Sequence, residues 1–495
     1  MQLTVLHYHF RPGGVRRVIE QGLPALIRAA GLTRVVMLAG ESADQDWRRS
    51  MEQAVFPCDV AWLVAPALGY WAEQTIPACD IRAAIRETLC RVAAPDSVLW
   101  VHNLSVGRNM LLAQELVALP QNSTVWLHHH DWWWDGRWER WPEMNSQGIT
   151  SLEEAASLTL PSGPQIIHFC VNAGDARGLR AWTGMDVCFL PNPLVAQVSD
   201  GDETKKARTF LRGITSTESC WVYPCRGLRR KNIAETLLVQ RWLDPDTAVV
   251  TTGAPSSDVE RLYIESLETA ALKNGWPLHM GVCRHPCAPS VPSLISAADT
   301  VAVTSLREGF GMVYHEAAAA SRPLVARIPN GLEETLRAIG FQFSFAWNAL
   351  QIPRRFYDES AESRRTAENR SRLKALLPPS LHPALEMQKP PCVTTMDFGR
   401  LSLSAQLEVL SHSPDITRRT CLPLNPVLFL PRSVQPPAAA VWSPDSWASA
   451  LLLYARKPHS APACHLDWPR WTVSVLTPQV HSWLSHPLLW EASVS

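Results

Sequence analysis

Two glutamates in the second half of the chain have the spacing of a ligand-binding pair. Glu308 and Glu316 are separated by seven residues, and Gly309 and Gly311 lie between them. A glycine-rich turn that opens a helix lets the backbone approach a ligand, and the helix N-terminus favours an anion. A carboxylate can also accept hydrogen bonds from two neighbouring hydroxyls, which suits a sugar or a ribose. The alternative interpretation is a surface turn with two solvated glutamates.

A basic run at another strand-to-helix turn could bind a diphosphate. Arg226 and Lys231 lie five residues apart in it. An arginine fork together with a lysine point charge is a good clamp for two phosphates. The neighbouring Arg229 and Arg230 are expected to be solvated, and the alternative is that the whole run is a solvated loop. Arg327, farther along the chain, has two interpretations. It either adds a cation to the same region or is an arginine on the surface.

Two weaker signals occur in the first 130 residues. Gly13 and Gly14 follow the first expected strand, where they would allow phosphate or an acceptor to come close, unless they form an ordinary turn. His128 and His130 end another strand and, as alternate residues, share one face. Strand ends are where α/β folds bind ligands, although a run of histidines can also be a metal site or part of a loop.

Alternating strand and helix patterns must position these residues. The first part of the chain has strands expected at 3–7, 35–38, 98–101, 124–127 and 166–171. After a polar segment at 197–208, expected to be a hinge, a second series has strands at 221–223, 248–252, 300–304 and 324–326. The pattern predicts two open parallel α/β sheets, with the ligand site in the cleft between them at the carboxyl ends of the strands.

The domain boundaries follow from these patterns. We expect an N-terminal Rossmann-like domain at 1–195 and a C-terminal Rossmann-like domain at 205–345. Residues 346–413 are expected to be a mainly helical extension. Proline, tryptophan and serine dominate residues 414–495, so that we expect an irregular tail and assign it no fold.

Composition limits the partners and the location of the chain. Lys+Arg and Asp+Glu both number 46, and the formal net charge of zero argues against a nucleic-acid partner. The sequence has no apolar run of about 18 residues and no signal-peptide pattern, so we expect a cytoplasmic location. Peripheral membrane contact is left open. The 12 cysteines contain no CxxC pair and are expected to be reduced thiols, and we expect no required metal.

The order of these motifs resembles that of family four of the retaining glycosyltransferases, which have the GT-B fold. The hallmark of that family is two glutamates separated by seven residues, which Glu308 and Glu316 match. Arg226 and Lys231 match its arginine and lysine five residues apart, and the N-terminal Gly-Gly loop is matched as well. The resemblance implies two Rossmann-like domains that face a central cleft, with the acceptor on the N-terminal side and the donor on the C-terminal side.

The resemblance also implies a role for each residue. Arg226 and Lys231 would hold the donor diphosphate and stabilise it as a leaving group. Glu308 would contact the donor sugar, and Glu316 would bind the nucleotide ribose. His128 or His130 would lie near the donor sugar. Backbone groups of the glycine-rich turns would face the donor phosphate or the acceptor: Gly13, Gly14, Gly309, Phe310 and Gly311.

The implied activity is a metal-independent, retaining transfer of a hexosyl group to a hydroxyl of a sugar, a glycolipid or a small molecule. A nucleotide-diphospho-sugar is the donor and co-substrate, and no cofactor is expected. The resemblance covers about residues 1–335. The chain departs from the family in having Ala320, Ser321 and Arg322 before Pro323, where the family usually has a glycine. Two alternatives are a catalytically inactive, sugar-nucleotide-binding GT-B protein and another GT-B enzyme such as a sugar-nucleotide epimerase.

Overall fold

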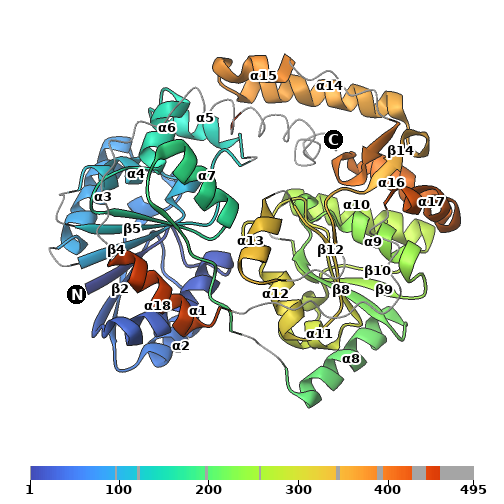
Figure 1. The fold of residues 1–495 in the computed structure, drawn as a ribbon, viewed down its shortest axis with the longest axis horizontal. Coiled ribbons are helices and arrows are strands. Elements are labelled where there is room, and N and C mark those ends of the chain that lie inside the picture. The colour runs from blue at the N-terminus through green and yellow to red at the C-terminus, as the bar shows by residue number, and fades with distance from the viewer. Residues whose placement is uncertain are drawn as a thin grey trace. The chain divides into compact units, whose positions relative to one another are not determined.

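The chain forms two compact units (Figure 1). The computed structural model describes residues 2–456 and residue 476, apart from 95–96, 120–122, 136, 196–198, 256–257, 330, 342–345, 387–393 and 426–441. The first unit comprises the described residues within 1–195, 376–382 and 442–480. The second comprises those within 196–375, 383–441 and 481–495.

A seven-stranded parallel sheet forms the centre of the first unit, in the order β3-β2-β1-β4-β5-β6-β7. Its strands are β1 Gln2–Leu6, β2 Arg34–Ala39, β3 Asp59–Val64, β4 Ser97–His102, β5 Thr124–His129, β6 Ile166–Cys170 and β7 Val187–Phe189. Its helices are α1 Gly14–Ala30, α2 Gln45–Val55, α3 Ala78–Val92, α4 Met110–Val117, α5 Arg140–Asn145, α6 Leu152–Thr159, α7 Ala173–Thr183 and α18 Pro444–Ala455.

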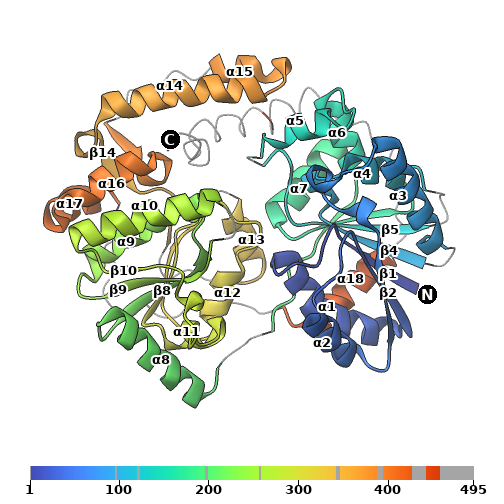
Figure 2. The ribbon, with the colours of Figure 1, turned by 180° about the vertical axis from the view of Figure 1, so that it is seen from behind.

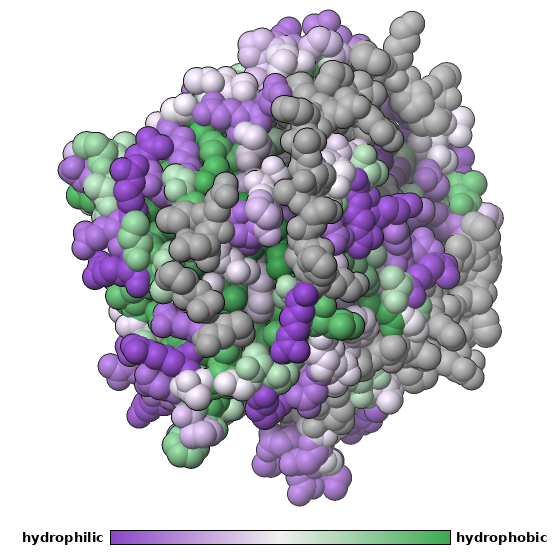
Figure 3. Space-filling view, turned by 60° about the vertical axis from the view of Figure 1, so that its left-hand side comes forward, coloured by the Kyte–Doolittle hydropathy of each residue, from purple (hydrophilic) through white to green (hydrophobic). Residues whose placement is uncertain are grey.

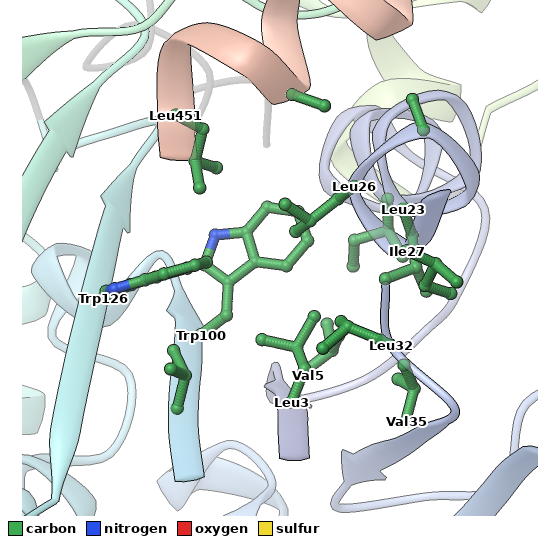
Figure 4. Packing of buried hydrophobic residues seen from close by; sticks show 14 of the residues in the cluster. Leu3, Val5, Leu23, Leu26, Ile27, Leu32, Val35, Trp100, Trp126 and Leu451 are labelled. Carbon is green, nitrogen blue, oxygen red and sulfur yellow. The ribbon is translucent and has the colours of Figure 1, made fainter. Parts of the chain in front are cut away.

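One hydrophobic core of the first unit lies between this sheet and helices α1 and α18, and a second combines strand residues with helices α3 and α4. Apolar residues recur along α1 at helical spacing, so one side of the helix, including Leu23 and Leu26, faces the strands. Trp100 of β4 lies among these residues with Leu451 of α18 beside it (Figure 4). Burying each such side chain stabilises the fold by about 1.5–3 kcal/mol.

Helix α18 comes from the part of the chain for which no fold was assigned. It packs against α1 where Gly22 leaves room for Trp447, because a Cβ at Gly22 would lie 2.7 Å from the indole ring. The expected irregular tail at 414–495 therefore contains at least two helices, α17 Pro414–Cys421 and α18. Within that segment, residues 426–441, 457–475 and 477–495 lie outside the described residues.

The second unit contains a six-stranded parallel sheet in the order β10-β9-β8-β11-β12-β13 (Figure 2). Its strands are β8 Cys220–Arg226, β9 Ala248–Gly253, β10 Leu278–His279, β11 Thr300–Val303, β12 Leu324–Arg327 and β13 Ala346–Trp347. Its helices are α8 Gly201–Thr215, α9 Ile233–Leu243, α10 Asp258–Asn274, α11 Val291–Ala297, α12 Met312–Ala319 and α13 Leu332–Ala338. The expected α/β class with two Rossmann-like sheets is confirmed.

The segment at 197–208 was expected to be a hinge, and most of it is helical instead. Helix α8 begins at Gly201, and the Asp200 side chain caps it by accepting a hydrogen bond of 2.7 Å from the Glu203 amide. The polar residues from Asp200 onward are thus a helix cap and a solvated helix face. The boundary between the two units falls just before this segment, between Val195 and Ala196, and residues 197–198 lie outside the described residues.

Most of the extension after residue 346 belongs to the second unit, whereas residues 376–382 belong to the first. It contains a two-stranded antiparallel sheet, β14 Gln351–Pro353 and β15 Thr395–Asp397, and the helices α14 Glu359–Leu376, α15 His382–Glu386, α16 Leu403–Ser411 and α17. Trp242 of α9 donates a hydrogen bond of 2.9 Å to the Thr417 hydroxyl of α17. The Arg241 guanidinium of α9 donates one of 2.5 Å to the carbonyl of Leu410.

Arg327, expected to be a surface arginine or a cation near the site, is buried in an ion-pair network. Its guanidinium lies 2.8 Å from the Glu235 carboxylate of α9 and 2.6 Å from the Asp397 carboxylate of β15. Burial alone would lower the pKa of Arg327, but these two carboxylates raise it. The prediction was wrong because both partners are far from Arg327 in the sequence.

The surface of the described residues is mixed in character. On the face drawn in Figure 3, hydrophilic residues are interspersed with smaller hydrophobic areas. Among the described helices, none combines the length and the apolar composition needed to cross a bilayer.

Candidate functional site

The two strongest motifs meet at the point where the strand order of the second sheet reverses. Strands β9 and β10 continue the sheet on one side of β8, and β11 begins the other side. Ligands of open α/β sheets bind beyond the carboxyl ends of the strands at such a point. Arg226 is the last residue of β8, and Glu308 follows the end of β11 by five residues. The structure thus brings the basic and acidic motifs to one edge of one sheet.

Lys231 and Glu308 form an ion pair at this edge. The Lys231 Nζ atom contacts Oε1 of Glu308, and the side chains are only 12% and 15% exposed. Burial alone would raise the pKa of the Glu308 carboxyl. The charges of Lys231 and Arg230, with hydrogen bonds from Lys231 and Ser305, lower that pKa below its ordinary value. Glu308 is therefore an anion near neutral pH, beside a fixed cation.

Hydrogen bonds connect the two loops that carry this pair. The carbonyl oxygen of Lys231 accepts bonds of 3.1 Å from the Tyr223 hydroxyl of β8 and from the Thr304 hydroxyl after β11. The hydroxyls of Tyr223 and Ser305 lie 2.6 Å apart. Sequence analysis missed these three positioning residues, although hydroxyl residues directly after an apolar strand were a usable signal.

The turn after Lys231 contains a residue in the left-handed backbone conformation. Asn232 has φ of 55°, a conformation that asparagine tolerates better than most residues. Its side-chain amide donates a hydrogen bond of 2.7 Å to Glu235 and accepts one of 3.0 Å from Gln406. Gln406 belongs to α16, so the C-terminal extension contributes directly to the position of the basic loop.

The three arginines of the basic run differ in their exposure and in their partners. Arg226 is exposed, and its guanidinium lies 3.7 Å from the carboxylate of Glu260. Arg230 donates a hydrogen bond of 3.2 Å to the carbonyl of Arg307. Arg229 is buried and donates one of 2.7 Å to the carbonyl of Leu401. The expectation that Arg229 is solvated is wrong, because the extension covers it.

The glycine-rich turn leads into helix α12. Gly311 is its N-cap residue with φ of +78°, where a Cβ would lie 2.8 Å from the Tyr314 ring, so glycine is required there. The side chain of Phe310 is buried and stacks on His315 at 5.0 Å between ring centroids. Only the backbone of Phe310 could therefore meet a ligand. Glu316 lies half-buried in α12, and Gly309 lies half-buried in the turn before it.

Two candidate positions lie in the first unit at the N-terminus of α1. Gly13 is the N-cap residue of this helix and Gly14 its first residue. A Cβ at Gly14 would meet no described atom within 4 Å, and one at Gly13 would come no closer than 3.9 Å to the Arg11 carbonyl. Packing within the described structure therefore gives no reason for glycine at residue 14.

The histidines predicted near a donor sugar also lie in the first unit, at the end of β5. His128 is fully buried, whereas His130 is partly exposed. Together with His102 at the end of β4 they form a cluster of three imidazoles. Burial and the neighbouring histidines lower the pKa of His128 well below its ordinary value, and burial lowers that of His130 to about 4. In this conformation only His130 could touch a ligand from solvent.

One curated protein and several solved structures are similar to this chain. No known protein-family model matches the chain. Mannosylglucosyl-3-phosphoglycerate synthase of Petrotoga mobilis is 24% identical over 335 residues, which cover 63% of this chain and 62% of that protein. The chain thus spans less than two thirds of this curated relative.

The solved structures that are similar to this chain include those of HepE and WaaG. HepE of Anabaena, in complex with UDP and glucose, has a TM-score of 0.48 and 17% identity, covering 68% of this chain and 82% of that one. WaaG, a glycosyltransferase involved in lipopolysaccharide biosynthesis, has a TM-score of 0.47 and 13% identity, covering 88% of this chain and 100% of that one.

Proposed function

We propose that the chain is a retaining glycosyltransferase of the GT-B type that moves a sugar from a nucleotide-diphospho-sugar to an acceptor hydroxyl. The contact between Lys231 and Glu308, at the switch point of the second sheet, carries this proposal. It places a cation suited to a diphosphate beside a carboxylate suited to sugar hydroxyls. The sequence similarity to mannosylglucosyl-3-phosphoglycerate synthase supports a reaction of this class.

The proposed chemistry follows from the bond that breaks. That bond joins the anomeric carbon of the donor sugar to a phosphate oxygen, and negative charge builds up on the departing nucleoside diphosphate. Arg226 and Lys231 stabilise this charge. The acceptor oxygen attacks the anomeric carbon on the face from which the diphosphate leaves, and the departing phosphate oxygen takes the acceptor proton. The new bond keeps the anomeric configuration, and this scheme uses no protein nucleophile, cofactor or metal.

The remaining residues position the substrates in this scheme. Glu308 binds hydroxyls of the donor sugar, and Glu316 binds the ribose. Backbone amides of the turn before α12 point toward phosphate, where the helix N-terminus favours an anion. Gly14 leaves room for the donor phosphate or the acceptor, which is a sugar, a glycolipid or a small molecule. A cytoplasmic location, with peripheral membrane contact for a glycolipid acceptor, belongs to the same proposal.

Turnover of single variants tests the proposal. Wild type, Lys231→Ala and Glu308→Ala are incubated with UDP-, GDP- and ADP-sugars and a panel of acceptors, and released nucleoside diphosphate and glycosylated product are measured. Loss of one fixed charge at a developing anion is expected to lower the rate about 10²- to 10³-fold. Lys206→Ala is the matched control, because Lys206 is an exposed lysine of the same unit. Wild-type rates in both site variants would reject the proposal.

The same assay separates the inactive alternative. A sugar-nucleotide-binding protein without turnover would be stabilised by a nucleoside diphosphate in a thermal-shift screen, because a ligand of the folded state raises its stability. It would release no diphosphate and form no product with any donor. An epimerase would change the donor sugar in the absence of an acceptor.

A further inference from the structure

Three histidines of the first unit gather at the carboxyl end of its sheet. His102 ends β4, His128 lies beside it in β5, and His130 follows β5 on the same side as His128. Each offers one ring nitrogen, and these nitrogens all lie within 4.8 Å of one another. The ring centroids of His128 and His130 are 4.6 Å apart, and those of His102 and His130 are 5.3 Å apart.

The buried nitrogens of this cluster lack partners. His128 is 0% exposed and His102 is 1% exposed. Among the described residues, neither nitrogen of His128 has a hydrogen-bond partner, and Nε2 of His102 has none. A buried polar group without a partner costs about 1–3 kcal/mol, and native structures contain few of them. Because a neutral imidazole has one nitrogen with a free electron pair, His102 and His128 can each offer one buried nitrogen to a ligand that accepts electron pairs.

Imidazole coordinates a metal through a ring nitrogen that carries no proton. The 3.1 Å contact between His102 Nδ1 and His130 Nε2 requires one of the two to be an acceptor nitrogen.

We propose that His102, His128 and His130 together bind one divalent transition-metal ion, with Zn²⁺ as the preferred ion. Imidazole suits zinc, and three protein ligands with one open position is an established zinc arrangement. Zinc–nitrogen bonds of about 2.0–2.1 Å in a tetrahedral site bring ligand nitrogens to about 3.3 Å from one another. The rings must therefore turn inward by a small amount when the ion binds. The fourth position lies toward His130, the partly exposed member, and would take water or an oxygen ligand.

This inference stands on the first unit alone and does not depend on the proposed transfer reaction. It departs from the expectation, drawn from the sequence, that the chain requires no metal, and it concerns residues that the donor-site motifs of the second unit do not include. For His128 and His130, metal coordination replaces the direct contact with a donor sugar that the sequence predicts.

Aromatic packing is the competing explanation of the cluster. The ring of His128 stacks near Trp100 at 5.9 Å and near Trp447 at 6.5 Å between centroids. A phenylalanine at position 128 would keep this stacking and remove both nitrogens. His128→Phe therefore separates the two explanations, since it preserves or improves packing but deletes a metal ligand.

Metal titration of the full chain tests the proposal. The wild type, stripped with a chelator, is titrated with Zn²⁺ by calorimetry, metal content is measured by mass spectrometry, and Co²⁺ is used as a spectroscopic probe. We expect one equivalent of metal and a tetrahedral Co²⁺ spectrum. His128→Phe and His130→Gln are expected to weaken binding at least 100-fold, and Zn²⁺ is expected to raise the unfolding temperature of the wild type but not of these variants.

The control is His279→Gln, which changes a half-buried histidine of the second unit and is expected to bind like the wild type. Circular dichroism checks that each variant is folded, and His130→Gln gives the test on a partly exposed residue if His128→Phe does not fold. Failure of the wild type to bind one equivalent of Zn²⁺ or Co²⁺ would overturn the proposal. Equal affinity in the wild type and the two cluster variants would also overturn it.

Discussion

At the scale of single residues, the proposed activity depends on one ion pair. A largely buried pair such as Lys231 and Glu308 is costly to desolvate and is weak evidence for a role in stability. The carbonyl of Lys231 is fixed by the hydroxyls of Tyr223 and Thr304, so the backbone that carries the cation is held before a ligand arrives. Preorganised charge of this kind is what stabilises a departing anion.

Acid denaturation should report the charge of Glu308. Its pKa in the folded state is lowered from 4.5, so ionised Glu308 stabilises the fold above that pH. This contribution is lost as the pH falls through the lower folded-state pKa. We expect the difference in free energy of unfolding between wild type and Glu308→Gln to shrink as the pH falls from about 5 to about 3. Urea denaturation at a series of pH values measures this difference.

The matched control for that series is Glu333→Gln, which removes an exposed carboxylate of the same unit. Its difference from the wild type should be small throughout, because exposed ion pairs contribute little. A Glu308→Gln difference that is independent of pH would contradict the account.

Local patterns were enough to select two candidates that the structure brings together. Glu308 and Lys231 were chosen from spacing within short loops, and the structure brings them into contact. Arg229 and Arg327 were misassigned because their partners are not local. Leu401 is 172 residues from Arg229, and Asp397 is 70 residues from Arg327. A single sequence contains no signal for such distant pairings.

At the scale of elements, both sheets place their candidate residues at strand ends. β8 and β11 carry the basic and acidic loops, and β4 and β5 carry the histidine cluster. Strand periodicity and turn glycines made these positions predictable, because parallel strands all end at one edge. The short turn at Ser321 has a left-handed conformation with φ of 53° although the residue is not a glycine.

The N-terminus of α1 provides a test at this scale. Gly14→Ala places a methyl group where the described residues leave open space, so we expect stability equal to or slightly above that of the wild type. Turnover should fall, because the proposed donor or acceptor occupies that space. Gly201→Ala is the matched control, since Gly201 is also the first residue of a helix and has an open Cβ position. Equal turnover in both variants would show that the N-terminus of α1 does not belong to the proposed site.

The buried ion-pair network provides a second test. Arg327→Ala leaves the carboxylates of Glu235 and Asp397 without their cation, and we expect a loss of about 3–5 kcal/mol in free energy of unfolding. Arg337→Ala removes an exposed arginine and should cost no more than about 1 kcal/mol. Chemical denaturation measures both. Similar small losses would mean that the network does not hold the extension on the second unit.

At the scale of the whole molecule, the end of the chain returns to the first unit. Helix α18 fills the space over α1, with Trp447 fully buried against Gly22. Composition concealed this helix, because proline-, tryptophan- and serine-rich flanks resemble an irregular segment. The two-sheet architecture was predictable from alternating patterns, whereas the docking of the last segments was not, because tertiary contacts alone determine it.

Removal of the Trp447 side chain tests whether helix α18 stabilises the first unit. We expect Trp447→Ala to cost about 3–5 kcal/mol, because a large cavity opens in the core of the first unit. Amide hydrogen exchange should become faster in α1 than in α9 of the second unit. Leu453→Ala is the control, because Leu453 lies on the exposed side of the same helix. Unchanged exchange in α1 would show that α18 does not stabilise the first unit.

The most direct test of the central claim is a calorimetric titration with UDP, GDP and ADP. We expect the wild type to bind at least one of them, Lys206→Ala to bind it equally, and Lys231→Ala to bind it about 10- to 100-fold more weakly, as the loss of a charged hydrogen bond predicts. If the wild type binds none of the three, or if Lys231→Ala binds as tightly as the wild type, Lys231 does not belong to a diphosphate site.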